Sequence, residues 1–254
     1  MIPILTDARD IAAMRAACRL SAEILAEVVA EVKAGVTTGE LDVFAADRMR
    51  ARGVESAFYR YGGFPGYCCI SINDEVVHGI PGGRVVNEGD LVSVDLGVKT
   101  QGFNGDNAAS VCVGRCDPEV VRLNEVCREA LRAGVDAARA GNRAGDIGAA
   151  VQKVSEGAGF GVVRDYCGHG VGRHLHEEPN IPNYGRAGKG PLLKEGMCLA
   201  IEPMITLGTF RVEVLDNDWT VVTRDGKAAA HWENTVLVRA HGAPEILTLA
   251  GGLA

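Results

Sequence analysis

The pattern of apolar positions predicts helices at the start of the chain. In residues 7–33, apolar side chains recur at the three- and four-residue spacing of an amphipathic helix, and the pattern ends just before a glycine. A second helix is expected over 41–52, because Thr37 and Glu40 stand in the relation of a capping box and Gly53 follows the last helical residue. The chain is therefore expected to begin with a pair of helices.

Beyond these helices the pattern changes to strands, and the whole order then repeats. Residues 54–114 hold β-branched and aromatic runs separated by Gly, Pro and Asn, as strands and turns do. Helical spacing returns at 117–140, which an Asp-Pro pair opens, and at 145–157. Residues 160–248 again have the pattern of strands and loops. The order of helices, strands, helices and strands favours an α+β fold over alternating βαβ units.

Two pairs of segments resemble each other across the halves of the chain. AGVTTGEL (34–41) aligns with AGNRAGDI (140–147) at an offset of 106 residues, and EGDLVSVD (88–95) aligns with EGMCLAIE (195–202) at an offset of 107. Because the two offsets are nearly equal, we infer a duplicated α+β unit. Each half is then expected to bring an acidic residue to the same place on a strand, about a pseudo-two-fold axis.

The stretch LVSVDLGVKTQGFNGDNAAS (91–110) has the pattern of a β-hairpin, yet it carries Asp95 and Asp106 where apolar side chains are expected. A turn centred between Thr100 and Gln101 would set the two carboxylates opposite each other, with Cβ atoms about 5 Å apart. Such a pair is destabilising unless a proton or a cation lies between the charges. The apolar neighbours cannot solvate it, so a metal site is favoured over a solvent-facing sheet edge.

Further candidate ligands lie in the second half. The segment CGHGVGRHLHEEP holds three histidines between glycines: His169, His174 and His176. A single histidine in such a loop is more often a surface residue than a ligand, but Glu202 and Glu233 lie in apolar strand patterns, where a carboxylate requires a partner. Four carboxylates and one imidazole suit two divalent ions, and they favour Mn, Fe, Co or Zn over all-oxygen Mg or Ca sites.

Composition and charge exclude several classes of protein. At 254 residues the chain fits one large domain or two small ones, and its formal net charge of −7 comes without the basic clusters of a nucleic-acid-binding protein. No signal-peptide pattern and no apolar run near the roughly 18 residues of a membrane span is present, so we expect a cytoplasmic protein. The eight cysteines are scattered without a C-x-x-C pair, which indicates reduced, mostly buried thiols.

Seven residues occur in order within short motifs: His78 in VVHGIP, Asp95 in VDLG, Asp106 in GFNGD, His169 in YCGHGVGR, His176 in HEEP, Glu202 in IEPM and Glu233 in WENTV. Together they resemble the functional positions of one enzyme family, the methionine aminopeptidases of the bacterial, short type I kind. The likeness covers about residues 5–248. It implies the duplicated pita-bread fold, in which pseudo-two-fold symmetric antiparallel sheets are covered by helices. It also implies a single catalytic metallopeptidase domain over 1–254, with repeats near 7–114 and 117–248.

The resemblance implies a role for each matched residue. Two divalent metal ions (Co, Mn, Fe or Zn) would be held by Asp95, Asp106, His169, Glu202 and Glu233. Of these, Asp106 and Glu233 would bridge the two ions. Glu202 would take a proton from the attacking water, His176 would bind the developing oxyanion, and His78 would contact the scissile amide nitrogen.

The matching positions for the methionine pocket are Tyr61, Phe64, Cys69 and Trp219, and plain core packing is the alternative for these four. The implied activity removes the initiator methionine from nascent polypeptides, at the ribosome, when the second residue is small. The resemblance also suggests a monomer. Two departures from the family pattern are Asn234, where a histidine is expected, and His174, where a smaller or less basic residue is expected.

Three alternatives remain open from the sequence. Prolidase and aminopeptidase P share the fold but carry a large N-terminal domain, whereas 77 residues precede His78 here. A type II methionine aminopeptidase needs a helical insertion, and the 30 residues between Glu202 and Glu233 leave no room for it. A non-catalytic pita-bread protein that binds RNA or proteins would lose metal ligands, all five of which are present.

Overall fold

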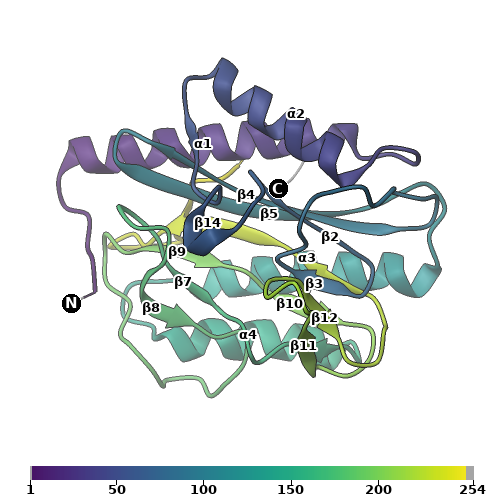
Figure 1. The fold of residues 1–254 in the computed structure, drawn as a ribbon. Helices are drawn as coiled ribbons and strands as arrows, with labels where there is room; N and C mark the ends of the chain where they lie inside the picture. The colour runs from purple at the N-terminus through teal and green to yellow at the C-terminus, as the bar shows by residue number, and fades with distance from the viewer. Residues whose placement is uncertain (1, 250–254) are drawn as a thin grey trace.

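Four α-helices and fifteen strands lie in residues 2–249, the part of the chain that the computed structural model describes. The helices are α1 (Ala8–Glu31), α2 (Thr38–Ala51), α3 (Pro118–Ala137) and α4 (Ala144–Gly157). In Figure 1, α1 and α2 lie above the two long strands of residues 91–112, and α3 and α4 lie below those two strands. All four predicted helices are confirmed, and none of the helices in residues 2–249 combines the length and hydropathy that a membrane span needs.

Corresponding helices in the two halves begin in similar ways. Before α2, the Thr37 side chain accepts the Glu40 backbone N–H at 3.1 Å, and the Glu40 carboxylate accepts the Thr37 N–H at 2.8 Å. Before α4, Asp146 accepts the Arg143 backbone N–H at 2.7 Å, but an arginine side chain has no acceptor for the return bond. The two helix starts are therefore 106 residues apart, as the sequence alignment predicts.

The strands of residues 2–249 form one large sheet and two small ones, and every strand pair is antiparallel. The large sheet has the order β1-β4-β5-β14-β9-β7-β8, with β2 paired to β4 and β15 to β14. Its strands are β1 (Glu55–Ser56), β2 (Cys69–Ile72), β4 (Leu91–Thr100), β5 (Phe103–Cys112), β7 (Gly168–Gly170), β8 (Glu177–Ile181), β9 (Cys198–Ile201), β14 (Glu233–Leu237) and β15 (Glu245–Ile246).

The small sheets have the orders β13-β10-β6 and β11-β12-β3. Their strands are β3 (Glu75–Val77), β6 (Gly161–Val162), β10 (Met204–Thr206), β11 (Val212–Val214), β12 (Val221–Thr223) and β13 (Ala229–His231), and a short 3₁₀ turn, η1, covers Tyr61–Gly63.

The order of the large sheet agrees with the duplication. Strands β5 and β14 pair at its centre, and β4 and β9 flank them on opposite sides. Asp95 lies on β4, and Glu202 directly follows β9. The α+β class and the two related halves are thus confirmed, and the two aligned acids approach the centre of the sheet from opposite sides.

The predicted register of the first hairpin is wrong by one residue in the turn. Asp95 pairs with Ala108 and Asp106 pairs with Gly97, so the two acids are diagonal neighbours rather than directly opposite. The turn is centred one residue later than expected, at Gln101–Gly102, where both residues have left-handed φ angles of 51° and 79°. A two-residue hairpin turn with two positive φ values favours glycine at its second position, and Gly102 supplies it. Both acids remain on one face of the sheet.

Helix α1 packs closely on the strand that carries Asp106. At Gly105 on β5, an added Cβ would lie 2.5 Å from the backbone nitrogen of Cys18 and 2.6 Å from the carbonyl of Ala17, both in α1. Because the contact is with helix backbone, no side-chain rotation can relieve it. The absence of a side chain at this position lets the helix cover the sheet directly behind the acidic residue.

Replacing Gly105 with alanine is expected to lower the free energy of unfolding by about 1–3 kcal/mol, because the new methyl group overpacks the α1 contact. The matched control is Gly157→Ala in α4, where nothing lies within 4 Å of the added Cβ. That control should be neutral or slightly stabilising. Chemical denaturation of both variants measures the difference, and equal stability of the two would show that the close α1 contact is absent.

Candidate metal centre and adjoining pocket

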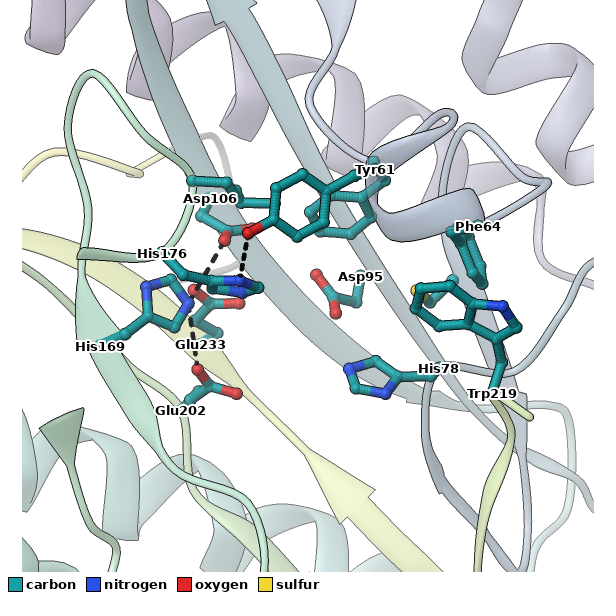
Figure 2. A pocket seen from close by; sticks show the side chains of 13 residues that line it. Tyr61, Phe64, His78, Asp95, Asp106, His169, His176, Glu202, Trp219 and Glu233 are labelled. Atoms are coloured by element: carbon teal, nitrogen blue, oxygen red, sulfur yellow. Dashed lines mark hydrogen bonds and ion pairs between the residues drawn. The ribbon is translucent and has the colours of Figure 1, made fainter. Parts of the chain in front are cut away.

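The structure brings the five predicted metal ligands together on one face of the large sheet. They line a common pocket and come from five places in the fold: Asp95 from β4, Asp106 from β5, His169 from β7, Glu202 directly after β9, and Glu233 at the start of β14. Figure 2 shows their side chains converging from these strands. Ligand atoms of Asp106, His169 and Glu233 all lie within 4.8 Å of one another.

The apolar strands explain why these acids are buried. Asp95 follows LVSV and Glu202 follows CLAI, and all four residues before each acid are buried. Asp106 and Glu233 are each only 3% exposed. The hydrophobic strands anchor the sheet, and their side-chain alternation directs the carboxylates to the same side. Burial of the strand therefore carries the acids away from water.

Burial leaves polar atoms in this cluster without partners. Asp95 Oδ1, Asp106 Oδ1 and Glu233 Oε1 are buried and accept no hydrogen bond from residues 2–249. Burial raises the pKa of Asp106 to about 7. Burial and the neighbouring carboxylates hold the pKa values of Asp95, Glu202 and Glu233 well above their usual range. A cluster of this kind requires protons or cations between its oxygens.

His169 is held in the form that binds a metal. Its Nδ1 lies 2.9 Å from the Gly170 carbonyl oxygen, which can only accept, so Nδ1 carries the proton. The free Nε2 faces Glu202 Oε1 at 3.5 Å and Asp106 Oδ2 at 3.8 Å. Burial and nearby His176 lower the pKa of His169 to about 3, so the ring is neutral near pH 7. One imidazole among carboxylates fits borderline divalent cations.

His176 lies beside this cluster and forms a hydrogen bond with Tyr61. Its Nδ1 is 2.9 Å from the Tyr61 hydroxyl, and its ring meets His169 edge-on at 4.3 Å between centroids. Partial burial lowers the pKa of His176. His174, two residues earlier, is exposed and does not line the pocket, and its backbone N–H donates to Glu177. Of the three histidines in this segment, His169 and His176 therefore reach the site and His174 does not.

His78 lies toward Trp219, on the side of the pocket away from His169 and His176, as Figure 2 shows. Its ring meets Tyr166 and Trp219 edge-on, at 5.6 Å and 6.3 Å between centroids. Burial, with a smaller effect of nearby His176, lowers the pKa of His78 to about 4, so this imidazole is also neutral near pH 7.

The predicted methionine-pocket residues line the apolar side of the same cavity. Phe64, Cys69, Trp219 and Tyr61 all contribute, and the rings of Phe64 and Trp219 meet at 5.1 Å between centroids. The cavity encloses about 570 Å³ of empty space, part of which is open to solvent. All four positions thus line a cavity, and Phe64 and Cys69 also belong to a small hydrophobic cluster against which Trp219 packs.

Sequence reasoning missed three residues near the site. Phe58 and Leu175 also line the cavity, and His231 is a buried residue whose Nε2 lies 3.6 Å from Glu202 Oε2. The position of His231, two residues before Glu233, could have indicated that it faces the same side. Phe58 lies in a loop, where no periodic pattern predicts side-chain direction.

Asn234 does not take part in the site. It is buried, and its amide donates to the Thr248 hydroxyl at 3.0 Å. Since Glu233 faces the acids, the alternation of strand β14 directs its neighbour to the other side of the sheet. The departure at this position therefore affects packing behind the site and not its ligands.

A second hollow adjoins the first. The two share His78, His169, His176 and Glu202, and the second is continued by the segment 165–167. A molecule that spans both would place its central atoms beside the shared residues, with one end in the aromatic cavity.

Comparisons with known proteins agree with this geometry. Residues 12–240 match the model of metallopeptidase family M24. The chain is 50% identical over 215 residues to a methionine aminopeptidase of Clostridium acetobutylicum, which covers 84% of this chain and 86% of the relative. It is 45% identical over 246 residues to a methionine aminopeptidase of Clostridium perfringens, covering 97% of this chain and 98% of the relative.

Solved structures show the same fold. A methionine aminopeptidase of Thermotoga maritima superposes with a TM-score of 0.96 at 43% identity, covering 98% of this chain and all of the other. A prolidase of Pyrococcus furiosus superposes with a TM-score of 0.78 at 24% identity and shares only the fold, and 66% of its length is covered. The chain belongs to metallopeptidase family M24 and, within it, to the methionine aminopeptidases.

Proposed function

We propose that this protein removes the initiator methionine from nascent polypeptides and peptides when the second residue is small. One observation carries the proposal: the buried carboxylates and an apolar cavity of suitable size open onto the same histidines. The substrate is then the free N-terminus of a nascent chain. We further propose that the whole chain is one catalytic domain that acts as a monomer in the cytoplasm, close to the ribosome.

We propose that two divalent ions are held by the five clustered residues, with Asp106 and Glu233 as the bridging carboxylates. The unpartnered carboxylate oxygens and the neutral imidazole support this donor set. Mn, Fe, Co and Zn all suit it, and availability in the cell selects among them. When bound, such ions supply an acidified water and polarise the scissile carbonyl.

Three residues of the chain would supply the remaining catalytic roles. Burial and the neighbouring carboxylates raise the pKa of Glu202 and favour a bound proton in the metal-free cluster; once cations replace that proton, the carboxylate can accept the proton of the attacking water. If the Tyr61 hydroxyl donates to His176 Nδ1, the opposite nitrogen carries a proton that it can donate to the developing oxyanion. His78 faces the same centre from the other side and contacts the departing amine.

The shape of the cavity supports selection of methionine. Phe58, Phe64, Leu175 and Trp219 give it apolar walls, and Cys69 places a small polarizable side chain among them. An unbranched, polarizable thioether adapts to such walls, whereas a β-branched side chain would meet them next to the scissile bond. Valine and isoleucine should therefore be poor first residues.

The test of the proposed function is kcat/KM over a series of Met-X-Ser peptides, with a Val-Ala-Ser control. Small second residues such as Gly, Ala and Ser should be cleaved, and Lys, Arg and Leu rejected, because bulk beside His176 displaces the scissile carbonyl. A displacement of about 1 Å can lower the rate on the order of a hundredfold. A flat profile, or a preference for proline after a non-methionine residue, would indicate a proline-directed peptidase instead.

Replacing Asp106 with asparagine should have opposite effects on stability and on metal binding. The folded-state pKa of about 7 exceeds the ordinary 3.8, so the folded protein binds more protons than the unfolded chain, and this group's contribution to stability is lost as pH rises between these values. In the metal-free protein near pH 8, Asp106→Asn should therefore raise the free energy of unfolding, on the order of 2–4 kcal/mol.

The gain over the unsubstituted protein should shrink as pH falls from about 7 to about 4, and stabilisation by added Mn²⁺ should be reduced in the variant. Asp47→Asn, on exposed α2 surface, is the control and should change neither quantity. Thermal unfolding with and without Mn²⁺ measures both. A variant that is less stable without metal, or equally stabilised by it, would argue against a metal centre at Asp106.

A further inference from the structure

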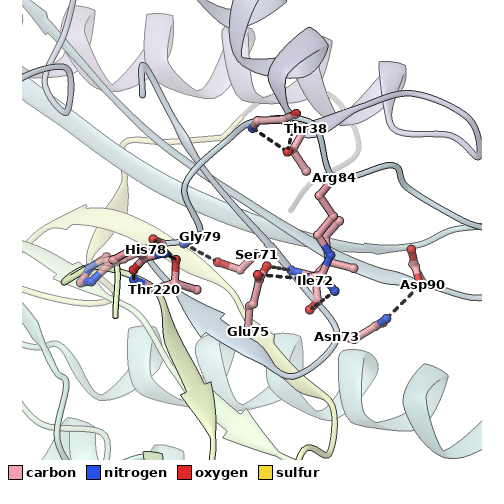
Figure 3. Close-up of polar contacts among 12 residues, drawn as sticks. Thr38, Ser71, Ile72, Asn73, Glu75, His78, Gly79, Arg84, Asp90 and Thr220 are labelled. Atoms are coloured by element: carbon pink, nitrogen blue, oxygen red, sulfur yellow. Dashed lines mark hydrogen bonds and ion pairs between the residues drawn. The ribbon is translucent and has the colours of Figure 1, made fainter. Parts of the chain in front are cut away.

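The peptide group that joins His78 to Gly79 is held at both of its polar atoms by buried hydroxyls, as Figure 3 shows. The carbonyl oxygen of His78 accepts from Thr220 Oγ1 at 3.4 Å, and the N–H of Gly79 donates to Ser71 Oγ at 3.1 Å. Ser71 lies on β2, and Thr220 directly precedes β12. Two separate elements therefore fix the orientation of one peptide plane.

This peptide needs to be held, because His78 has an unfavourable backbone conformation. Its φ angle is +59°, in the left-handed region that residues other than glycine seldom adopt. Residue 79 has no room for a side chain, since an added Cβ would lie 2.2 Å from the Ile70 carbonyl oxygen. Such a conformation persists only where the surroundings determine it. Here it directs the His78 ring into the cavity.

Thr220 is itself held in an arrangement that leaves its proton for His78. The amide of Asn217 donates to Thr220 Oγ1 at 2.9 Å, so the hydroxyl hydrogen is free for the His78 carbonyl. The Asn217 side-chain oxygen accepts the backbone N–H of both Trp219 and Thr220, at 3.0 Å and 2.8 Å. This short turn therefore positions Trp219, which lines the apolar cavity, and also supports His78 beside it.

Neither hydroxyl lines the cavity. Ser71 is 3% exposed and Thr220 is 2% exposed, so neither reaches substrate or solvent. Both act on the site only through the backbone of residue 78. Packing alone requires no hydroxyl at Ser71 or at Thr220. Yet each residue places a buried hydroxyl at one end of the same peptide group, next to a histidine with a left-handed backbone.

We propose that Thr220 and Ser71 are positioning residues that hold the His78 imidazole against the departing amine. The inference rests on the proposed function, and it adds the two hydroxyls as determinants of turnover. Without the Thr220 hydroxyl, the 78–79 peptide plane can rotate and the strained backbone of His78 can relax with it, so the imidazole moves away from the scissile bond while the methionine cavity keeps its walls. Turnover should fall, and substrate affinity should not.

The experiment is a double-mutant cycle on metal-loaded protein with Met-Ala-Ser. Thr220→Val keeps the shape of the side chain and removes the hydroxyl, and it should lower kcat on the order of tenfold with KM little changed. Thr220→Ser should restore kcat. The matched control is Thr223→Val, three residues further along, which removes a buried hydroxyl that donates to the Lys227 carbonyl at 2.7 Å. This control should leave kcat unchanged.

The second arm of the cycle replaces His78 with asparagine, which tolerates a left-handed backbone but has no imidazole. In that background, Thr220→Val should cause no further loss of kcat. An equal loss in both backgrounds would overturn the inference, as would a Thr223→Val variant as slow as Thr220→Val. If His78→Asn alone keeps full kcat, His78 has no part in turnover and the inference falls, while the specificity profile still tests the proposed function separately.

A crystal structure of the metal-free Thr220→Val variant provides a readout apart from activity. We expect His78 to leave the left-handed region and its ring to turn away from the cavity, with Trp219 in place. An unchanged His78 would overturn the inference even if the variant were slow.

Discussion

Mutual repulsion among buried carboxylates is the constraint on which the rest of this structure depends. Asp95, Asp106, Glu202 and Glu233 lie on one sheet face with their pKa values raised by burial, and three of their oxygens accept no hydrogen bond from residues 2–249. A sheet that only had to be stable would place apolar side chains there. The protein keeps the acids together because strands and helices around them are well packed.

The duplicated fold supplies that packing in a symmetric way. Strands β4 and β9 bring one acid each from opposite sides of the central β5-β14 pair, and the helices cover the apolar strands. The contact between α1 and the sheet is close at Gly105, because an added Cβ there would meet the backbone of α1. A rigid sheet keeps the repelling carboxylates from separating, so the repulsion is available to bind cations. In the proposed function, the nearby aromatic cavity selects which chain end can reach them.

Much of this arrangement can be predicted from the sequence. The helix starts follow from local capping residues such as Thr37 and Glu40, and the ligands are visible as acids in apolar strand patterns. The hairpin register was missed because it depends on the left-handed turn at Gln101–Gly102, whose position a count from the acids cannot give. Loop side chains such as Phe58 were missed because no periodicity governs their direction.

The contacts that hold His78 could not be predicted for a related reason. Ser71 and Thr220 are ordinary polar residues in strand-like surroundings, 149 positions apart, and only the pairing of β12 with β3 brings Thr220 beside His78. Long-range pairing of this kind follows from the whole fold. Local patterns in the sequence therefore indicate which residues carry chemistry more readily than which residues hold them in place.

The most direct test of the metal centre is calorimetric titration of metal-free protein with Mn²⁺, near neutral pH, in buffers that differ in ionisation enthalpy. If raised pKa values leave protons on the buried carboxylates, binding must release those protons to the buffer. The account predicts about two ions per chain and a net release of protons that becomes smaller in Asp106→Asn. Binding without proton release, or release unchanged by that substitution, would contradict it.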